Sequence, residues 1–140
     1  TMLKYTTFAD KHSMFNTPPC FAVYVLQLVM KWIEETVGGL ANMEKLNRQK
    51  AALLYDYLDT SDFYNGTAAK EDRSVMNVTF LLQDSSLEGI FIEGALANGL
   101  VGLKGHRSVG GCRASIYNAS TLEAVEALVS FMAEFERKHG

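Results

Sequence analysis

The order of hydrophobic patterns in the second half of the chain restricts the fold most strongly. Residues 74–82 alternate, with Met76, Val78 and Phe80 on one side, which is typical of a strand with one face on a core. The patterns that follow predict a helix, a short apolar strand, a second strand and a final helix, at residues 85–97, 100–103, 113–117 and 121–138. This β-α-β-β-α order predicts an α+β fold, with a small, largely antiparallel sheet covered by helices on one face.

Two helices are expected in the first half. From residue 20 to about 36, apolar residues occur on most faces of a helix, so we expect a helix that is buried on most sides. Gly38-Gly39 should end it, because glycine tolerates the left-handed conformation at a helix end. A second helix is predicted at 41–58, with an apolar stripe in which Lys50 is the only non-apolar member. The aliphatic stem of that lysine could lie along the stripe.

The remaining segments are expected to be irregular. Residues 1–12 are mixed in character and should be extended or irregular. Residues 59–72 are polar and contain Asn65-Gly66, a turn signal. Ser85, followed three residues later by Glu88, predicts a capping box at the start of the third helix.

Composition narrows the class of protein. The chain has 140 residues, of which 48% are hydrophobic, enough for the core of a single domain. A formal net charge of -3 argues against a general nucleic-acid binder, and no apolar run approaches the roughly 20 residues of a membrane-spanning helix. Cys20 and Cys112 lie far apart and match no metal-binding spacing. We therefore expect a cytoplasmic protein with reduced thiols, no metal, and neither nucleic acid nor membrane as a partner.

Residues 104–113, KGHRSVGGCR, concentrate three cations, a histidine and three glycines on this mildly acidic chain. Glycines let backbone N–H groups approach an anion closely. Arg113 begins an apolar strand, where a partly desolvated guanidinium would require a counter-anion. Two interpretations are open, a bound small anion or a protein carboxylate in a structural salt bridge. The segment is not a P-loop, because Gly111-Cys112 stands where Lys-Ser/Thr would follow.

A second candidate anion site is Asn16-Thr17-Pro18-Pro19, which precedes the first predicted helix. The free N–H groups and the dipole of a helix start favour a phosphate, to which the amide and the hydroxyl could add donors. Simple N-capping of the helix is the alternative interpretation.

Three motifs together resemble the phosphoserine aminotransferase family. They are residues 12–19 (HSMFNTPP), 73–78 (RSVMNV) and 105–118 (GHRSVGGCRASIYN), and the terminal Phe135-Glu136-Arg137 matches as well. The resemblance extends over essentially all 140 residues, in the right order, and concerns only the C-terminal part of that enzyme. It implies a type I fold dependent on pyridoxal 5'-phosphate, in which a large domain holds the cofactor. Residues 1–140 would then form a single small C-terminal domain, with 1–19 as the connection from the large domain.

The resemblance also implies an activity and residue roles. Members transfer the amino group between L-glutamate and 3-phosphohydroxypyruvate in serine biosynthesis, act as homodimers, and in some bacteria also serve vitamin B6 synthesis. Arg113 resembles the arginine that binds the substrate α-carboxylate. His106 and Arg107 resemble the pair that holds the substrate phosphate across the dimer interface. Asn16 and Thr17 resemble residues that hydrogen-bond the cofactor phosphate of the partner subunit.

The sequence departs from the family in one major respect. The lysine that binds the cofactor, the acid that pairs with its pyridine nitrogen and the aromatic residue that stacks on its ring have no counterpart here, so the chain contains no candidate catalytic residue. Because the chemistry requires those groups, we expect no transaminase activity from this chain alone. Two alternatives stay open, a free-standing anion-binding or regulatory module without catalysis, and another type I enzyme such as a cysteine desulfurase.

Overall fold

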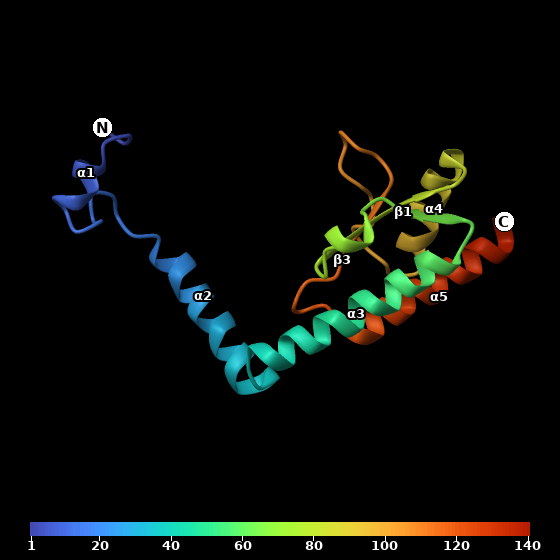
Figure 1. The fold of residues 1–140 in the computed structure, drawn as a ribbon, viewed down its shortest axis with the longest axis horizontal. Helices are drawn as coiled ribbons and strands as arrows, with labels where there is room; N and C mark the ends of the chain where they lie inside the picture. Colours follow the sequence, from blue (N-terminus) through green and yellow to red (C-terminus); the bar gives the residue numbers. More distant parts are fainter. The chain divides into compact units, whose positions relative to one another are not determined.

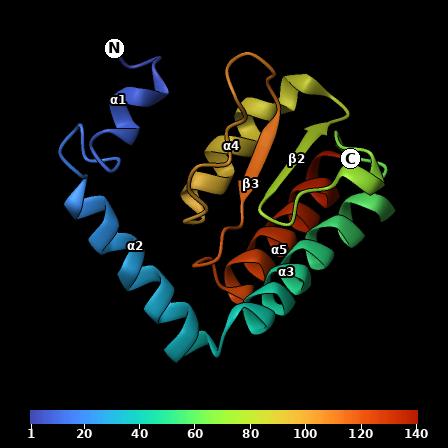
Figure 2. The same ribbon diagram turned by 60° about the vertical axis from the view of Figure 1, so that its left-hand side comes forward.

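A computed structural model describes residues 1–140, which form two compact units, residues 1–40 and 41–140. The first unit contains α1 (Tyr5–Ala9), α2 (Cys20–Trp32) and a π-helical turn (Ile33–Val37). The second contains nearly all of α3 (Leu40–Thr60), then β1 (Tyr64–Gly66), β2 (Asn77–Leu82), α4 (Glu88–Ala97), β3 (Cys112–Ser115) and α5 (Leu122–His139). Figure 1 labels most of these elements, and Figure 2 adds β2.

The first unit differs from its prediction in two places. Residues Tyr5–Ala9 form a short helix, whereas residues 1–12 were expected to be extended or irregular. Local hydrogen bonds follow the helix, such as that from Ser13 N–H to the Phe8 carbonyl at 2.8 Å. The helical stretch that begins with α2 and continues through the π-helical turn ends at Gly38, whose φ of 86° is left-handed, as predicted. The expectation that this helix is buried on most sides is wrong for the first unit. No residue of α2 is buried, and within its unit the helix packs mainly against the adjoining π-helical turn.

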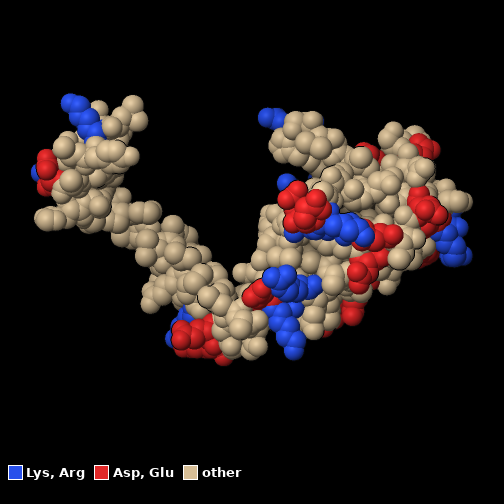
Figure 3. All heavy atoms as spheres, viewed as in Figure 1, with Lys and Arg blue, Asp and Glu red and all other residues tan.

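The surface of α2 is almost free of charge. Lys31 is the only charged residue in the helix, and exposed apolar side chains such as Phe21 occupy its remaining faces. On the face drawn in Figure 3, this stretch is uncharged except near its C-terminal end.

The second unit confirms the α+β prediction. Its three strands pair antiparallel in the order β1-β2-β3, and helices cover one face of the sheet (Figure 2). Two predictions about strands are wrong. Asn65-Gly66 lies within the edge strand β1 instead of a turn, because Asn65 pairs with Leu81. Residues 100–103 form no strand, and only an isolated bridge between Lys104 and Cys112 extends the sheet there.

The helices of the second unit begin and end close to their predicted bounds. The cap of the third predicted helix is Asp84 rather than Ser85, since Asp84 Oδ1 accepts a hydrogen bond from Ser86 N–H at 2.9 Å. A short 3-10 turn, Ser85–Leu87, then leads into α4. Thr121 caps α5 through a 3.2 Å hydrogen bond from Ala124 N–H. Helices α3 and α5 lie side by side in both ribbon views (Figures 1 and 2).

Aromatic side chains fill the core between the sheet and the helices. Tyr64 and Phe80 come from the sheet, Phe91 from α4 and Phe135 from α5, and their rings meet edge to face at 5.1–5.9 Å. Such T-shaped contacts add to the stabilisation from apolar burial. Since side chains alternate along a strand, the residues between these inward-facing positions lie on the other face of the sheet, which no helix of this unit covers.

Candidate functional site

Arg113 lies on the uncovered face of the sheet. Its neighbours in β3, Cys112 and Ala114, are buried, and its cross-strand partner is Thr79 of β2. Arg113 is only partly exposed, and its Nε–H is buried without a hydrogen-bond acceptor. No Asp or Glu of the chain forms an ion pair with Arg113. The structural salt bridge that the sequence left open is therefore not present, and the planar donor group is free to bind an anion.

The basic loop is a tight hairpin that leads into β3. Gly105 N–H donates to the Gly111 carbonyl at 2.8 Å, next to the bridge between Lys104 and Cys112. Gly111 has a φ of 67°, and a Cβ atom there would lie 2.5 Å from Leu81 Cδ2. A side chain at Gly111 would therefore combine a strained backbone with a steric clash.

The end of this hairpin presents two polar side chains to solvent. The Ser108 backbone N–H and hydroxyl approach His106 Nδ1 at 3.3 and 2.6 Å. The backbone N–H can only donate, so Nδ1 is the acceptor and the proton of the neutral ring resides on Nε2. Arg107 is exposed and forms no ion pair. The hairpin thus offers an imidazole N–H and a second guanidinium, and Ser108 is an orienting residue that sequence reasoning missed.

Asn16 and Thr17 lie before α2 in the first unit. The N-cap of α2 is Pro19, and no side chain caps the helix, so the capping interpretation of this segment is wrong. Both residues are exposed, and the Asn16 amide contacts only the sulfur of Met2, at 3.9 Å. Their amide and hydroxyl donors at the start of a 13-residue helix fit the oxygens of a phosphate. Asn16 and Thr17 belong to the first unit, whereas Arg113 belongs to the second.

Lys50 was expected to extend its stem along the apolar stripe of α3, yet its ammonium is buried as well. Only 2% of the residue is exposed. Its Nζ donates to the carbonyls of Ile116, Tyr117 and Ser120 at 3.2, 2.7 and 2.9 Å. Burial lowers the pKa of this ammonium from its usual value. A lysine in the middle of an apolar stripe was the only indication of this in the sequence. It did not distinguish a buried ammonium from a lysine whose stem lies along the stripe while its ammonium stays in water.

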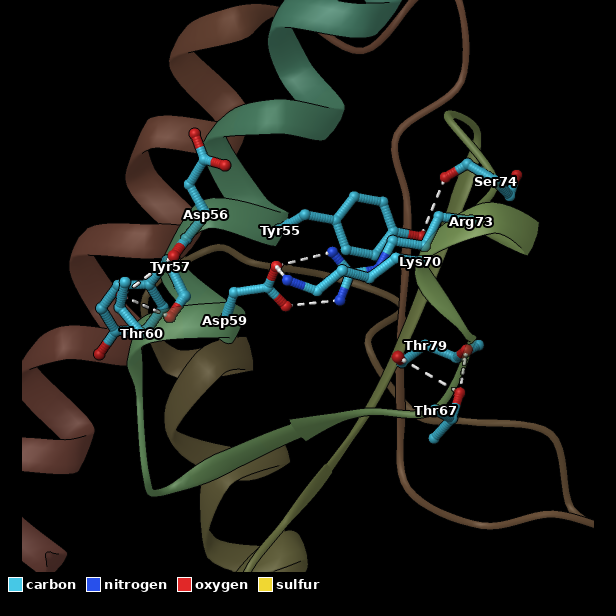
Figure 4. A network of polar contacts seen from close by, with 10 residues as sticks. All are labelled: Tyr55, Asp56, Tyr57, Asp59, Thr60, Thr67, Lys70, Arg73, Ser74 and Thr79. Carbon is cyan, nitrogen blue, oxygen red and sulfur yellow. Dashed lines mark hydrogen bonds and ion pairs between the residues drawn. The ribbon is translucent and has the colours of Figure 1, made fainter.

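A polar network ties the segment before β2 to α3 (Figure 4). Arg73 donates to both carboxylate oxygens of Asp59, at 2.9 and 2.5 Å, and its guanidinium carbon lies 4.5 Å from the centre of the Tyr55 ring. Lys70 adds a second ion pair to Asp59 at 3.0 Å. The Tyr55 hydroxyl donates to the Ser74 carbonyl at 3.0 Å. Arg73 is thus held by the protein itself, in contrast to Arg113.

Neither a metal cluster nor a membrane-spanning helix is present in the structure. No group of three or more His, Cys, Asp or Glu side chains is arranged to hold a metal ion. None of the helices combines the length and the apolar character needed to cross a membrane.

Comparison with known proteins places the chain in a family. Residues 1–128 match the model of the aminotransferase class-V family, and the chain belongs to that family. Among its relatives are the phosphoserine aminotransferases of Desulfatibacillum aliphaticivorans and Syntrophobacter fumaroxidans. Each is 66% identical over all 140 residues of this chain. The chain spans 39% of the length of each of these relatives.

Solved structures agree with this assignment. Phosphoserine aminotransferase from Bacillus circulans subsp. alkalophilus superposes with a TM-score of 0.90 at 51% identity, covering 99% of this chain and 38% of that protein. Phosphoserine aminotransferase from Trichomonas vaginalis with bound PLP gives a TM-score of 0.82 at 41% identity, covering 92% of this chain and 37% of that one. The resemblance predicted from the sequence motifs is therefore confirmed.

Proposed function

We propose that this chain is the part of a phosphoserine aminotransferase that binds the anionic groups of the substrates. The whole enzyme would transfer the amino group between L-glutamate and 3-phosphohydroxypyruvate in serine biosynthesis. One observation carries the proposal. The partly buried guanidinium of Arg113 lies on the uncovered sheet face with its Nε–H unpaired and no acid of the chain beside it. A cation in such surroundings is stabilised when an anion completes its hydrogen bonds, and both substrates carry an α-carboxylate.

The two halves of the basic segment would have different tasks. Arg113 would bind the α-carboxylate through its planar fork, since a guanidinium can donate two parallel hydrogen bonds to a carboxylate. His106 and Arg107 would bind the phosphate of the phosphorylated substrate. Their exposure supports this role, as does the Ser108 contact that directs the imidazole N–H outward. In this proposal the pair acts across the interface of a homodimer.

The proposed enzyme uses pyridoxal 5'-phosphate, which supplies the electron sink for the reaction when it is bound. Asn16 and Thr17 would hold its phosphate group in the partner subunit. Their free amide and hydroxyl donors at the start of α2 are chemically suited to that task. The residues that act on the cofactor ring would come from outside these 140 residues. We therefore expect the chain alone to be inactive, and we place the parent enzyme in the cytoplasm.

Two substitutions in the full-length enzyme test this division. Arg113→Ala should weaken use of both substrates, because both carry the α-carboxylate. Loss of a charge-assisted, two-pronged contact should cost about 2–4 kcal/mol in kcat/KM for each. Arg107→Ala should instead raise KM selectively for 3-phosphohydroxypyruvate. Steady-state kinetics of both half-reactions provide the measurement.

Arg137→Ala serves as the matched control, because Arg137 is an exposed arginine in the last turn of α5. It should leave both half-reactions unchanged. Equal losses for glutamate and the phosphorylated substrate in the Arg107 variant would contradict the phosphate role. An Arg113 variant that uses glutamate normally would refute the carboxylate role.

A further inference from the structure

The buried ammonium of Lys50 fastens α3 to the segment that follows β3. An ammonium has three N–H donors, and the three carbonyls of Ile116, Tyr117 and Ser120 accept from it at 2.7–3.2 Å. No carboxylate pairs with it. Each of the three N–H donors thus has one backbone carbonyl oxygen as its acceptor. The lysine therefore fixes the path of the main chain and does not neutralise a carboxylate.

A second contact from the same helix strengthens this clamp. Asn47, one turn before Lys50, is 3% exposed and donates from Nδ2 to Asn118 Oδ1 at 2.8 Å. The segment held in this way begins three residues after Arg113. Ile116 N–H also donates to the Met76 carbonyl at 2.9 Å, which continues the ladder between β2 and β3 beyond its last paired residues.

The clamp and the Arg73 network hold the same end of the sheet. Since β2 and β3 are antiparallel, the start of β2 lies beside the end of β3, where Asn77 pairs with Ser115. The Tyr55 hydroxyl binds the Ser74 carbonyl just before β2, and Lys50 binds carbonyls just after β3. Helix α3 thus fixes both strands at one end, and Arg113 lies two residues from that end with Thr79 opposite.

We propose that Lys50 is a positioning residue, which sets the orientation of the Arg113 guanidinium by fixing the main chain after β3. This inference rests on one part of the proposed function, namely that Arg113 binds the substrate carboxylate. A carboxylate and a guanidinium form two parallel hydrogen bonds only within a narrow range of angles. A strand end that is free to move would lose this alignment while the core of the unit stays packed.

The test uses the full-length enzyme with Lys50→Met, which keeps the length of the side chain and removes its donors. We expect KM to rise on the order of 10-fold for both glutamate and 3-phosphohydroxypyruvate, with kcat within about twofold. Asn47→Ala is a milder second variant, should Lys50→Met fold poorly, and should give a smaller rise in both KM values. Arg48→Met removes an exposed cation of the same helix and should change neither KM.

A spectroscopic measurement separates positioning from plain stabilisation. The Arg113 Nε–H resonance, assigned by its loss in Arg113→Lys, should shift or broaden in Lys50→Met and Asn47→Ala. It should stay in place in Met132→Ala, because Met132 is buried and its carbonyl accepts from the Tyr64 hydroxyl, and Tyr64 pairs with Leu82 at the other end of β2 from the clamp. A Lys50 variant with reduced thermal stability but unchanged KM values and an unchanged Arg113 signal would overturn the proposal. If Arg113→Ala itself leaves glutamate KM unchanged, the proposed function fails, and the Nε–H signal alone then decides whether Lys50 positions Arg113.

Discussion

Arg73 and Asp59 form a two-pronged ion pair, with hydrogen bonds of 2.9 and 2.5 Å between the guanidinium and the two carboxylate oxygens. Hydrogen bonds from Arg73 first, and from Lys70 second, hold the pKa of Asp59 well below its usual value of 3.8. In the unfolded chain these contacts are lost, so between the two pKa values the unfolded state binds more protons. The pair therefore stabilises the fold above about pH 4, and this contribution is lost as the pH falls toward the folded pKa.

This relationship predicts the acid dependence of Asp59→Asn. The variant should be less stable than the wild type at pH 7, and the difference between the two should shrink at pH 3 and below. Urea unfolding at the two pH values is the measurement. Asp56→Asn is the control for removing one negative charge, because its carboxylate points away from Arg73 in Figure 4 and forms no ion pair. A difference that does not depend on pH would contradict the prediction.

The two thiols should differ sharply in reactivity. Cys20 is exposed, whereas burial, assisted by the charge of Glu88, raises the pKa of the Cys112 thiol to about 12. Since the thiolate is the reactive form, a thiol-specific reagent at pH 8 should label one cysteine in the native 140-residue chain and two after denaturation. Mass spectrometry of the labelled chain identifies the site. Labelling of both cysteines at similar rates would show that Cys112 is accessible.

Replacing Gly110 or Gly111 of the hairpin by alanine should reduce stability by different amounts. Gly110 and Gly111 have φ values of 78° and 67°, so alanine is strained at both positions. A Cβ at Gly110 meets nothing within 4 Å, whereas one at Gly111 lies 2.5 Å from Leu81 Cδ2 and 2.9 Å from the Phe80 carbonyl oxygen. Gly111→Ala should therefore be less stable than Gly110→Ala by roughly 1–3 kcal/mol in chemical unfolding. Equal losses would mean that the hairpin moves to relieve the clash.

A hydrogen bond between α3 and α5 should be measurable on its own. The Tyr57 hydroxyl donates to Glu136 Oε2 at 2.5 Å, and burial together with this carboxylate raises the pKa of Tyr57. Tyr57→Phe should reduce the free energy of unfolding by roughly 1–2 kcal/mol, because the acceptor is charged and partly buried. A double-mutant cycle with Glu136→Gln isolates the pairwise term. A coupling energy of zero would show that the two side chains act independently.

Periodicity identified the elements whose stability depends on one buried face. The alternation around Val78 and Phe80 located β2, and the three- and four-residue spacing of Val125, Leu128 and Met132 located α5. Periodicity did not predict the edge strand β1. Its three residues are held by pairing with β2, and a strand of this length is too short to show an alternating hydrophobic pattern. The strand expected at residues 100–103 illustrates the converse, since a short apolar run alone does not determine pairing.

The sequence indicated which residue types form the candidate site, but it did not indicate which groups surround and contact them. The sequence indicated Arg113 as a cation in an apolar strand, and left its partner undecided because a carboxylate could come from anywhere in the chain. The role of Lys50 depends on carbonyls 66 to 70 residues later, which no local pattern encodes. Ser108 was missed because a serine in a glycine-rich loop carries no signal until the hairpin brings it to His106.

Because Lys50 is buried, the reactivity of its amine depends on whether the chain is folded. Every other lysine is exposed, so reagents that acylate amines should modify all of them in the native protein and spare this one. An acyl group on Lys50 would have to be attached before α3 docks onto the end of the sheet, and it would then prevent that docking. Modification at this position therefore distinguishes chains that were labelled while unfolded from those that had already reached the native state.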